Sequence, residues 1–168
     1  LETSRARLKD LQSRDQQKAA VEKEIAAAEK QLQARGLALR QRRAAAAEKL
    51  APAVTAELKA LGFAHGAFAI PLAPAAEPAA SGLDQVEFAF APNVGEPMRP
   101  LRAIASSGEI SRVMLGLKVV LAAADRIPLL VFDEINANVG GETAHAVGRK
   151  LAQAARRRQV IAITHLPP

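Results

Sequence analysis

Apolar side chains recur every seven residues through the first fifty residues, a stretch without proline. Leu11, Ile25, Leu32 and Leu39 share one heptad position and Val21 and Ala28 share the neighbouring one, with Lys18 and Arg35 as interruptions. This repeat predicts a coiled-coil helix. A helix over residues 1–50 would be about 75 Å long at 1.5 Å per residue, and it could not bury its apolar stripe without a partner helix. The alternative, a helix on the surface of a globular domain, would be unusually long.

The segment from residue 51 to residue 100 shows shorter patterns. Pro52 suits the first turn of a new helix, which we expect to end at Gly62. Residues 63–72 predict a strand, whereas residues 73–82 are rich in proline, alanine, glycine and serine and predict a mobile loop. A turn is expected over residues 93–100. The alternation of apolar and other residues indicates a second strand through Val86, Glu87, Phe88, Ala89 and Phe90.

The last part of the sequence alternates between helical and strand-like patterns. Helical spacing of apolar residues predicts a helix over residues 107–124, and a second helix is expected over residues 142–155. Continuous apolar runs at residues 129–132 and 160–164 predict strands that are buried on both faces, as in a parallel sheet. This order indicates an α/β fold. We therefore expect an arm of residues 1–50 and an α/β domain of residues 51–168.

Composition and charge narrow the classes of function. The sequence has no cysteine, which excludes disulfides, thiolate metal sites and cysteine nucleophiles. No run of about 18 apolar residues predicts a membrane span, and no signal-peptide pattern is present. The net charge is +6, of which residues 1–50 carry +5. A basic arm is compatible with binding to nucleic acid or another anionic surface, although a well-solvated helix is the simpler interpretation.

Three residues with acid–base chemistry follow the two predicted strands: Asp133, Glu134 and His165. In an open α/β sheet, ligands bind beyond the carboxyl ends of the strands. An apolar strand followed by Asp-Glu is the Walker B arrangement, in which one carboxylate helps to hold Mg²⁺ and the next activates water. Ser106 and Glu109 form a capping-box pattern at a helix start, where free backbone N–H groups can bind an anion. Taken singly, each of these features is also common in purely structural roles.

The order of these motifs resembles the C-terminal lobe of an ABC-type ATPase: signature motif, Walker B motif, D-loop and switch histidine. Residues 100–112 (PLRAIASSGEISR) are similar to the signature region of the RecN family, the bacterial SMC-like ATPases of DNA repair. The likeness extends to VFDEI at 131–135, VGG at 139–141, THLP at 164–167 and NVGEP at 93–97. It implies the C-terminal lobe of an SMC-type ATPase head, which is half of a parallel-sheet P-loop NTPase, preceded by a long coiled-coil helix.

The resemblance implies a role for each motif residue. Glu134 would be the catalytic base, Asp133 would assist Mg²⁺ through water, and His165 would sense the γ-phosphate of ATP. The signature would contact the γ-phosphate of ATP held by the opposite subunit, and the D-loop would lie at the dimer interface. The implied ATP-binding residues are Ser106, Ser107, Gly108, Glu109 and Asn136.

The sequence contains no G-x-x-x-x-G-K-[ST] phosphate-binding loop. In the family this Walker A loop lies in an N-terminal lobe beyond the coiled coil, so we expect a fragment that hydrolyses ATP only together with that lobe. The other partners implied are the antiparallel arm of the same protein, a second head and DNA, with Arg40, Arg42 and Arg43 as candidate DNA contacts. The implied function is repair of double-strand breaks by recombination in the bacterial cytoplasm, at the nucleoid.

Two positions depart from the family pattern, which usually has glycine in place of Ser107 and aspartate in place of Asn136. A Cβ at residue 107 stands where backbone must approach phosphate closely, and Asn136 removes a charge from the D-loop. Either change could weaken hydrolysis. Two alternatives therefore stay open: another SMC-like or RecF-like head, or a non-catalytic coiled-coil DNA-binding scaffold with a degenerate ATPase lobe.

Overall fold

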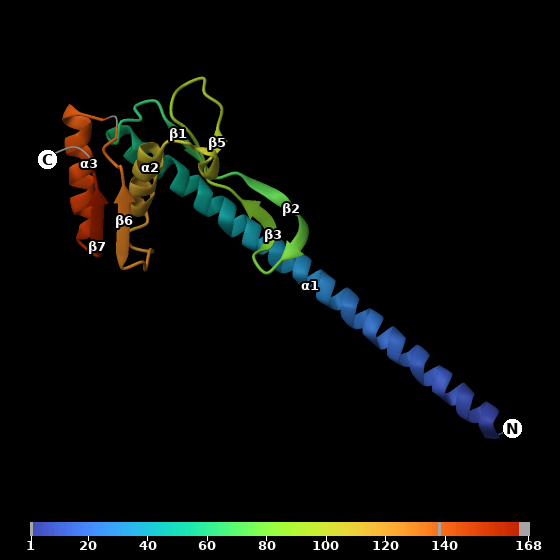
Figure 1. The fold of residues 1–168 in the computed structure, drawn as a ribbon. Helices are drawn as coiled ribbons and strands as arrows, with labels where there is room; N and C mark the ends of the chain where they lie inside the picture. The colour runs from blue at the N-terminus through green and yellow to red at the C-terminus, as the bar shows by residue number, and fades with distance from the viewer. Residues whose placement is uncertain (1, 138, 165–168) are drawn as a thin grey trace. The chain divides into compact units, whose positions relative to one another are not determined.

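The computed structural model describes the backbone of residues 2–137 and 139–164, and the side chains of Arg7 and of residues 13–137 and 139–164. Contacts divide the chain into two compact units (Figure 1). The first unit comprises Leu1–Arg43 and Pro74–Asp84, and the second comprises Ala44–Ala73 and Gln85–Pro168. The first unit thus groups residues 74–84 with the first part of the predicted arm. The predicted domain boundary at residue 50 stays a prediction.

A single helix, α1 (Glu2–Ala60), accounts for the predicted arm and continues beyond it. Its sequence is rich in alanine, leucine, lysine, arginine, glutamate and glutamine, which favour helix. The prediction that a new helix starts at Pro52 is wrong, because Pro52 lies inside α1. Proline cannot donate to the carbonyl four residues earlier, but Pro52 is exposed, so water can hydrate that carbonyl. The predicted end is confirmed: Gly62, with φ of 94°, follows the last turn.

A β-hairpin forms where the sequence predicted a mobile loop, and that prediction is wrong. Strand β2 (Leu72–Ala79) pairs with β3 (Gly82–Val86), and Gly82, with φ of 108°, supplies the left-handed backbone of the turn. The sequence signal was dominated by proline and alanine, which disfavour strands. The hairpin instead owes its order to contacts with distant residues of α1, which local patterns do not reveal.

In the first unit, a buried carboxylate and a close helix contact hold this hairpin against α1. The Asp84 side chain is fully buried and forms an ion pair with Arg40, while Arg43 Nη1 lies 4.0 Å from Asp84 Oδ2. Arg43 also donates a hydrogen bond to the carbonyl of Ser81 at 2.7 Å. A Cβ on Gly36 would stand 2.2 Å from Cδ1 of the Leu83 side chain, so glycine allows the close approach.

The second unit combines an antiparallel sheet with an α/β layer. Strands β1 (Ala67–Ala69), β4 (Ala89–Ala91) and β5 (Arg99–Pro100) form an antiparallel sheet in the order β1-β4-β5. A short 3₁₀ helix, η1 (Leu101–Ala103), leads to α2 (Ser107–Val120). Strand β6 (Leu129–Asp133), helix α3 (Gly141–Ala155) and strand β7 (Gln159–Ile163) complete the unit, with β6 and β7 paired in parallel. The predicted helix–strand–helix–strand order is therefore confirmed.

One hydrophobic core joins the elements of the second unit. The buried side chains come from the last turns of α1, the antiparallel sheet, both helices, β6 and the segments directly after α1 and β6. They include Val54, Leu58, Leu61, Phe63, Phe68, Phe90, Val113, Leu115, Leu117, Leu130, Phe132, Ile135 and Val147. Gly116 of α2 lies against Leu58 of α1 and against Leu61, which follows that helix. No helix of the described residues is both long and apolar enough to cross a membrane.

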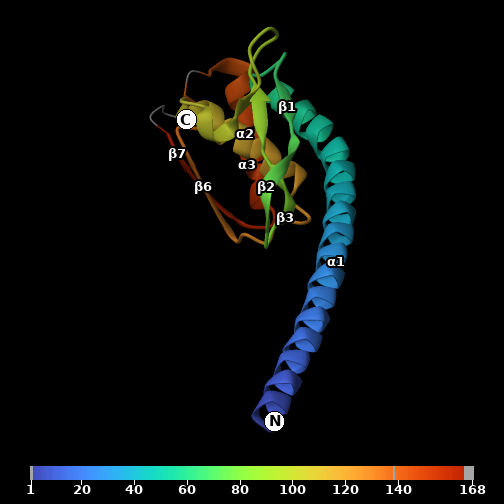
Figure 2. The same ribbon diagram turned by 90° about the vertical axis from the view of Figure 1, so that its right-hand side faces the viewer.

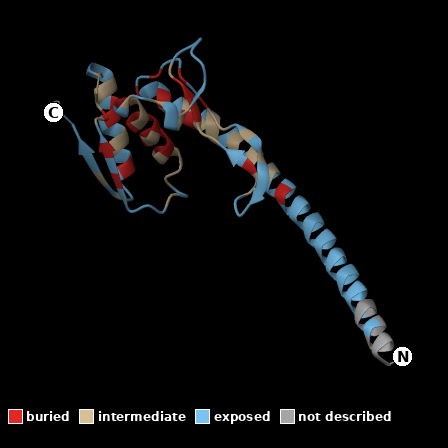
Figure 3. Cartoon of the chain, turned by 45° about the vertical axis from the view of Figure 1, so that its right-hand side comes forward, coloured by how far each residue is buried: buried red, intermediate tan, exposed pale blue. Residues whose placement is uncertain are grey.

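Strands β6 and β7 are covered on one face only. Both helices, α2 and α3, lie on the same side of this strand pair (Figure 2). Leu130 and Phe132 are buried, whereas Val131, Ile161 and Ile163 are 56%, 43% and 46% exposed. Most of β7 has the colour of exposed residues in Figure 3. The prediction that both strands are buried on both faces is therefore wrong for this chain. The apolar residues are present as predicted, but the described chain supplies no layer over the second face.

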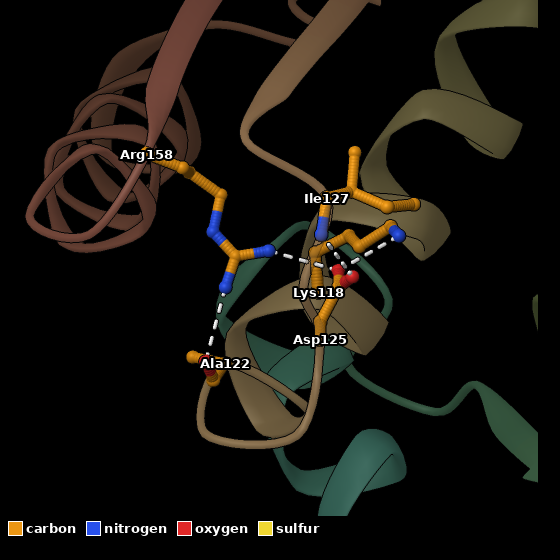
Figure 4. Close-up of polar contacts among 5 residues, drawn as sticks. All are labelled: Lys118, Ala122, Asp125, Ile127 and Arg158. Carbon is orange, nitrogen blue, oxygen red and sulfur yellow. Dashed lines mark hydrogen bonds and ion pairs between the residues drawn. The ribbon is translucent and has the colours of Figure 1, made fainter.

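A charged cluster ties the end of α2 to the start of β7 (Figure 4). Asp125 Oδ2 accepts hydrogen bonds from Lys118 Nζ and Arg158 Nη1, both at 2.8 Å, and Oδ1 accepts from the backbone N–H of Ile127 at 3.1 Å. Arg158 also donates to the carbonyl of Ala122 at 3.0 Å. These contacts, led by the hydrogen bond from Lys118, lower the pKa of Asp125 to about 2 from an ordinary value of 3.8, although burial acts in the opposite direction.

This low pKa predicts how acid weakens the fold. A carboxyl group whose pKa is lower in the folded state adds stability above its unfolded value of 3.8, and this stability is lost as the pH falls through about 2. Above this window, which lies between pH 3.8 and about pH 2, the parent should unfold at a higher denaturant concentration than Asp125→Asn. Inside the window the difference between the two midpoints should shrink. Chemical unfolding of both proteins at a series of pH values checks this. A difference that stays constant down to the low end of the window would contradict the assignment.

Candidate functional site

The signature residues lie at the start of α2, as predicted. Ser106 is the N-cap residue, and its Oγ accepts a hydrogen bond from the backbone N–H of Glu109 at 3.3 Å. This contact satisfies one of the N–H groups that the first turn of a helix leaves without an intrahelical partner. Ser107 is exposed, whereas Gly108 is buried. The helix start thus offers an accessible hydroxyl and the positive end of a helix dipole, which together suit an anion.

The two carboxylates lie at the end of β6, also as predicted. The Asp133 side chain is exposed, and the backbone carbonyl of Asp133 accepts a hydrogen bond from Ser111 Oγ at 2.6 Å. Glu134 has φ of 52°, a left-handed conformation that is uncommon for residues other than glycine. Its N–H donates to the carbonyl of Ile163 at 3.0 Å, and its carbonyl accepts from Ala137 N–H at 2.8 Å. Strain of this kind concentrates at functional sites.

The structure brings the helix start and the strand end into direct contact. The hydroxyl of Ser107 donates a hydrogen bond to Oε2 of Glu134, although the two residues are 27 positions apart in the sequence. Sequence reasoning placed both residues in an ATPase site but gave no reason for contact between them. This hydrogen bond puts the candidate base beside the candidate phosphate-binding helix end within a single chain.

Gly108 has a structural reason to be glycine. A Cβ at this position would stand 3.0 Å from both the Ala137 Cβ and the Glu134 carbonyl oxygen. The first turn of α2 therefore packs directly on the turn that follows β6. The sequence assigned Gly108 to phosphate binding, which stays a prediction, and packing against the 134–137 turn is a role that the sequence did not indicate.

Arg112 is a site residue that the sequence analysis missed. Its side chain is buried, and Nη1 donates to the carbonyls of Ile135 at 3.5 Å and Ala137 at 3.0 Å. The guanidinium also lies over the Phe63 ring, 5.1 Å from its centre. Burial lowers the pKa of Arg112, while Glu109 acts in the opposite direction. A signal existed: Arg112 shares a buried helical stripe with Leu115, Gly116 and Val119, where a charged residue needs internal partners.

Asn136 links the same turn to the end of β7. Its Oδ1 accepts a hydrogen bond from Thr164 Oγ1 at 2.6 Å, and its carbonyl accepts from Val139 N–H at 3.3 Å. Asn136 therefore has a defined place beside the strand end that precedes the predicted switch histidine. His165 itself lies outside the described residues, so its role stays a prediction.

The three arginines proposed for DNA contact all belong to the first unit, but their surroundings differ. Arg40 and Arg43 face the buried Asp84, as described above, whereas Arg42 is exposed. Replacing Arg40 or Arg43 would therefore disturb the hairpin as well as any DNA contact. DNA binding by this set stays a prediction, and Arg42 is the residue on which it can be tested cleanly.

The geometry fits a magnesium nucleotide better than a metal site formed by protein alone. Mg²⁺ in nucleotide sites usually takes one or two carboxylates together with phosphate and water oxygens. The exposed carboxylate of Asp133 at the end of β6, followed by Glu134, can supply such ligands. Among the described residues, no group of three or more His, Cys, Asp or Glu could hold a metal by itself. A metal here would thus need further oxygen ligands, which the phosphates of a nucleotide provide.

The fold of this chain is similar to that of solved Smc head domains. The Smc head domain with a coiled coil and joint from Pyrococcus yayanosii is similar in structure, with a TM-score of 0.50 and 22% sequence identity, over 70% of this chain and 22% of that one. The chain has the α/β fold of the C-terminal lobe of such a head, preceded by a long helix. The predicted fold class is therefore confirmed.

Curated relatives are similar over nearly the whole chain. The DNA repair protein RecN of Mycobacterium leprae is 41% identical over 98% of this chain and 31% of its own length. RecN of Treponema pallidum is 40% identical over 95% of this chain and 29% of its own length. RecN of Deinococcus radiodurans is 38% identical over 95% of this chain and 28% of its own length. No protein-family model matches the sequence. The chain is thus RecN-like, and it spans less than a third of the length of these relatives.

Proposed function

We propose that this chain is the C-terminal half of the head of a RecN-like ATPase that acts in double-strand-break repair by recombination. ATP is sandwiched between two heads and is hydrolysed to Mg-ADP and phosphate. The observation that carries this proposal is the hydrogen bond between Ser107 and Glu134, which joins an anion-binding helix end to a strand-end carboxylate pair. The identity to RecN favours this reading over a RecF-like head.

In this proposal each residue has a defined task. Bound Mg²⁺ would neutralise negative charge on the phosphates, and Asp133 would hold it, through water. Glu134 accepts a proton from the attacking water. Ser106 and the first backbone N–H groups of α2 orient the γ-phosphate of a nucleotide held by the opposite head. Asn136 lies in the D-loop at the dimer interface, and His165 senses the γ-phosphate.

The open face of β6 and β7 supports the need for a second lobe. Leu129, Val131, Ile161 and Ile163 expose 42% to 56% of their surface beside the Asp133 carboxylate. Exposed apolar groups gathered in this way usually mark an interface. Covering this face with the N-terminal lobe would bury them and bring the Walker A loop to the same edge of the sheet.

Reconstitution tests this proposal. The 168-residue chain alone should hydrolyse no ATP above background, because it has no phosphate-binding loop. Adding the N-terminal lobe of the same protein should restore ATP binding and turnover. Phosphate release by the chain, the lobe and their mixture provides the measurement. Robust hydrolysis by the purified chain alone would contradict the half-site, and an inactive mixture that forms a stable complex would favour the degenerate scaffold.

DNA binding by the arm is tested with Arg42. If Arg42 neutralises a phosphate of duplex DNA, Arg42→Gln in the complete protein should reduce the salt slope of DNA binding by about 0.9. Fluorescence anisotropy over a range of salt concentrations measures that slope. Arg102→Gln is the matched control, because Arg102 is 78% exposed and lies in the second unit. An unchanged slope in Arg42→Gln would mean that Arg42 does not contact DNA.

A further inference from the structure

The turn after β6 is fastened to the start of α2 by contacts of two kinds. Ser111 donates a hydrogen bond to the backbone carbonyl of Asp133. Arg112 donates hydrogen bonds to the backbone carbonyls of Ile135 and Ala137. The Ser107 hydroxyl instead holds the side-chain carboxylate of Glu134. The backbone of the turn and the position of its carboxylate are therefore controlled by different residues.

The backbone of Glu134 is fixed by hydrogen bonds at both its N–H and its carbonyl. The N–H of Glu134 is bonded to Ile163 and its carbonyl to Ala137. Its left-handed φ of 52° is held by these neighbours. The carboxylate can therefore leave Ser107 by side-chain torsions while the backbone of the turn stays in place.

The carboxylate lies beside the place where a phosphate would bind. The start of α2 is the positive end of a helix dipole, and its first N–H groups favour an anion. Ser107 is the first residue of α2, so its hydroxyl brings the negative charge of Glu134 to that helix end. Two anions repel each other at this short range. A phosphate arriving at the start of α2 and the carboxylate held by Ser107 therefore compete.

We propose that the Ser107 hydroxyl is a latch that holds the Glu134 carboxylate in a resting position at the start of α2, and that a nucleotide phosphate docking there releases it. The inference rests on the proposed function. Ser107 is a positioning residue in this scheme, because it acts through Glu134. Docking of one nucleotide on the helix end thereby frees the base of the same chain, which couples head closure to hydrolysis.

A double-mutant cycle tests the latch without hydrolysis. The complete two-lobed protein is titrated with an ATP analogue whose β–γ bridge cannot be cleaved, and light scattering reports head dimerisation. Removing the hydroxyl in Ser107→Ala should lower the analogue concentration at half-dimerisation by about ten-fold, as expected for loss of one hydrogen bond to a charged group. Ser107→Thr keeps the hydroxyl and should restore the parental midpoint.

The second arm of the cycle shows whether the effect passes through Glu134. In a Glu134→Ala background no carboxylate remains to be held, so Ser107→Ala should cause no further shift. A shift of equal size in both backgrounds, or a raised midpoint in Ser107→Ala, would overturn the latch, because Ser107 would then act on the nucleotide directly. A parent that does not dimerise with the analogue would contradict the proposed function and the latch together, whereas a dimerising parent with unshifted variants contradicts the latch alone.

Discussion

Replacing Glu134 by glutamine in the complete two-lobed protein is expected to lower ATP turnover by about 10²–10⁴-fold, the usual contribution of general acid–base catalysis. Glutamine keeps the shape of the side chain and an oxygen that can accept from Ser107. It cannot take the proton of the attacking water. ATP binding should survive, so head dimers with bound ATP should accumulate. Steady-state phosphate release and light scattering of the same sample measure both effects.

The control for this variant is Glu87→Gln. Glu87 forms an ion pair with the exposed Arg102, and neither residue is among the candidate site residues. The same chemical change there should leave turnover at the parental rate. Parental turnover in Glu134→Gln would refute the role of Glu134 as the base, and loss of ATP binding would show that the glutamate serves binding instead.

Replacing Arg112 by methionine should lower the free energy of unfolding by about 1.5–3 kcal/mol, the range for a hydrogen bond to a charged group. The change removes the donor to the carbonyls of Ile135 and Ala137 and the contact with the Phe63 ring. Those carbonyls are then left without this partner, and the turn that carries Glu134 loosens. We therefore expect turnover of the complete protein to fall as well, with denaturant unfolding and phosphate release as the measurements.

Two further variants separate packing from charge at Arg112. Arg112→Lys keeps the charge but presents a single ammonium group in place of a planar fork, so it should recover only part of the loss. Arg102→Met removes an arginine from an exposed ion pair and should cost about 0–1 kcal/mol. Equal unfolding free energies for the parent and Arg112→Met would contradict the role of Arg112 as the anchor of this turn.

Local patterns were sufficient for the helices and strands of residues 107–163. The strand predicted over residues 86–90 from its alternating pattern was wrong, because residues 87 and 88 separate β3 from β4. The helix after Ser106, the two strands at residues 129–133 and 159–163, and the helix between them all form close to where the sequence predicts them. The motif residues Ser107 and Glu134 could be assigned from their order along the chain. Their mutual contact could not, because it depends on how the β6 turn packs against α2.

Long-range contacts decided the remaining features. The hairpin over residues 72–86 depends on Gly36 and on the pairing of Asp84 with Arg40. Neither contact has a signature within the hairpin itself. The sequence predicted that β6 and β7 are buried on both faces because both strands are apolar at consecutive positions. One face is open in the structure, because the described chain does not supply a layer that covers it.

The most direct test of the account uses mixed dimers of the complete protein. One protein carries a defective Walker A lysine in its N-terminal lobe, and the other carries Ser106→Arg at the start of α2. Each protein alone should be inactive. If ATP is sandwiched between heads, the mixed dimer contains one site with an intact Walker A loop from one head and an intact signature from the other, so mixing should restore turnover. A mixture that forms heterodimers and stays as inactive as its components would contradict the sandwich.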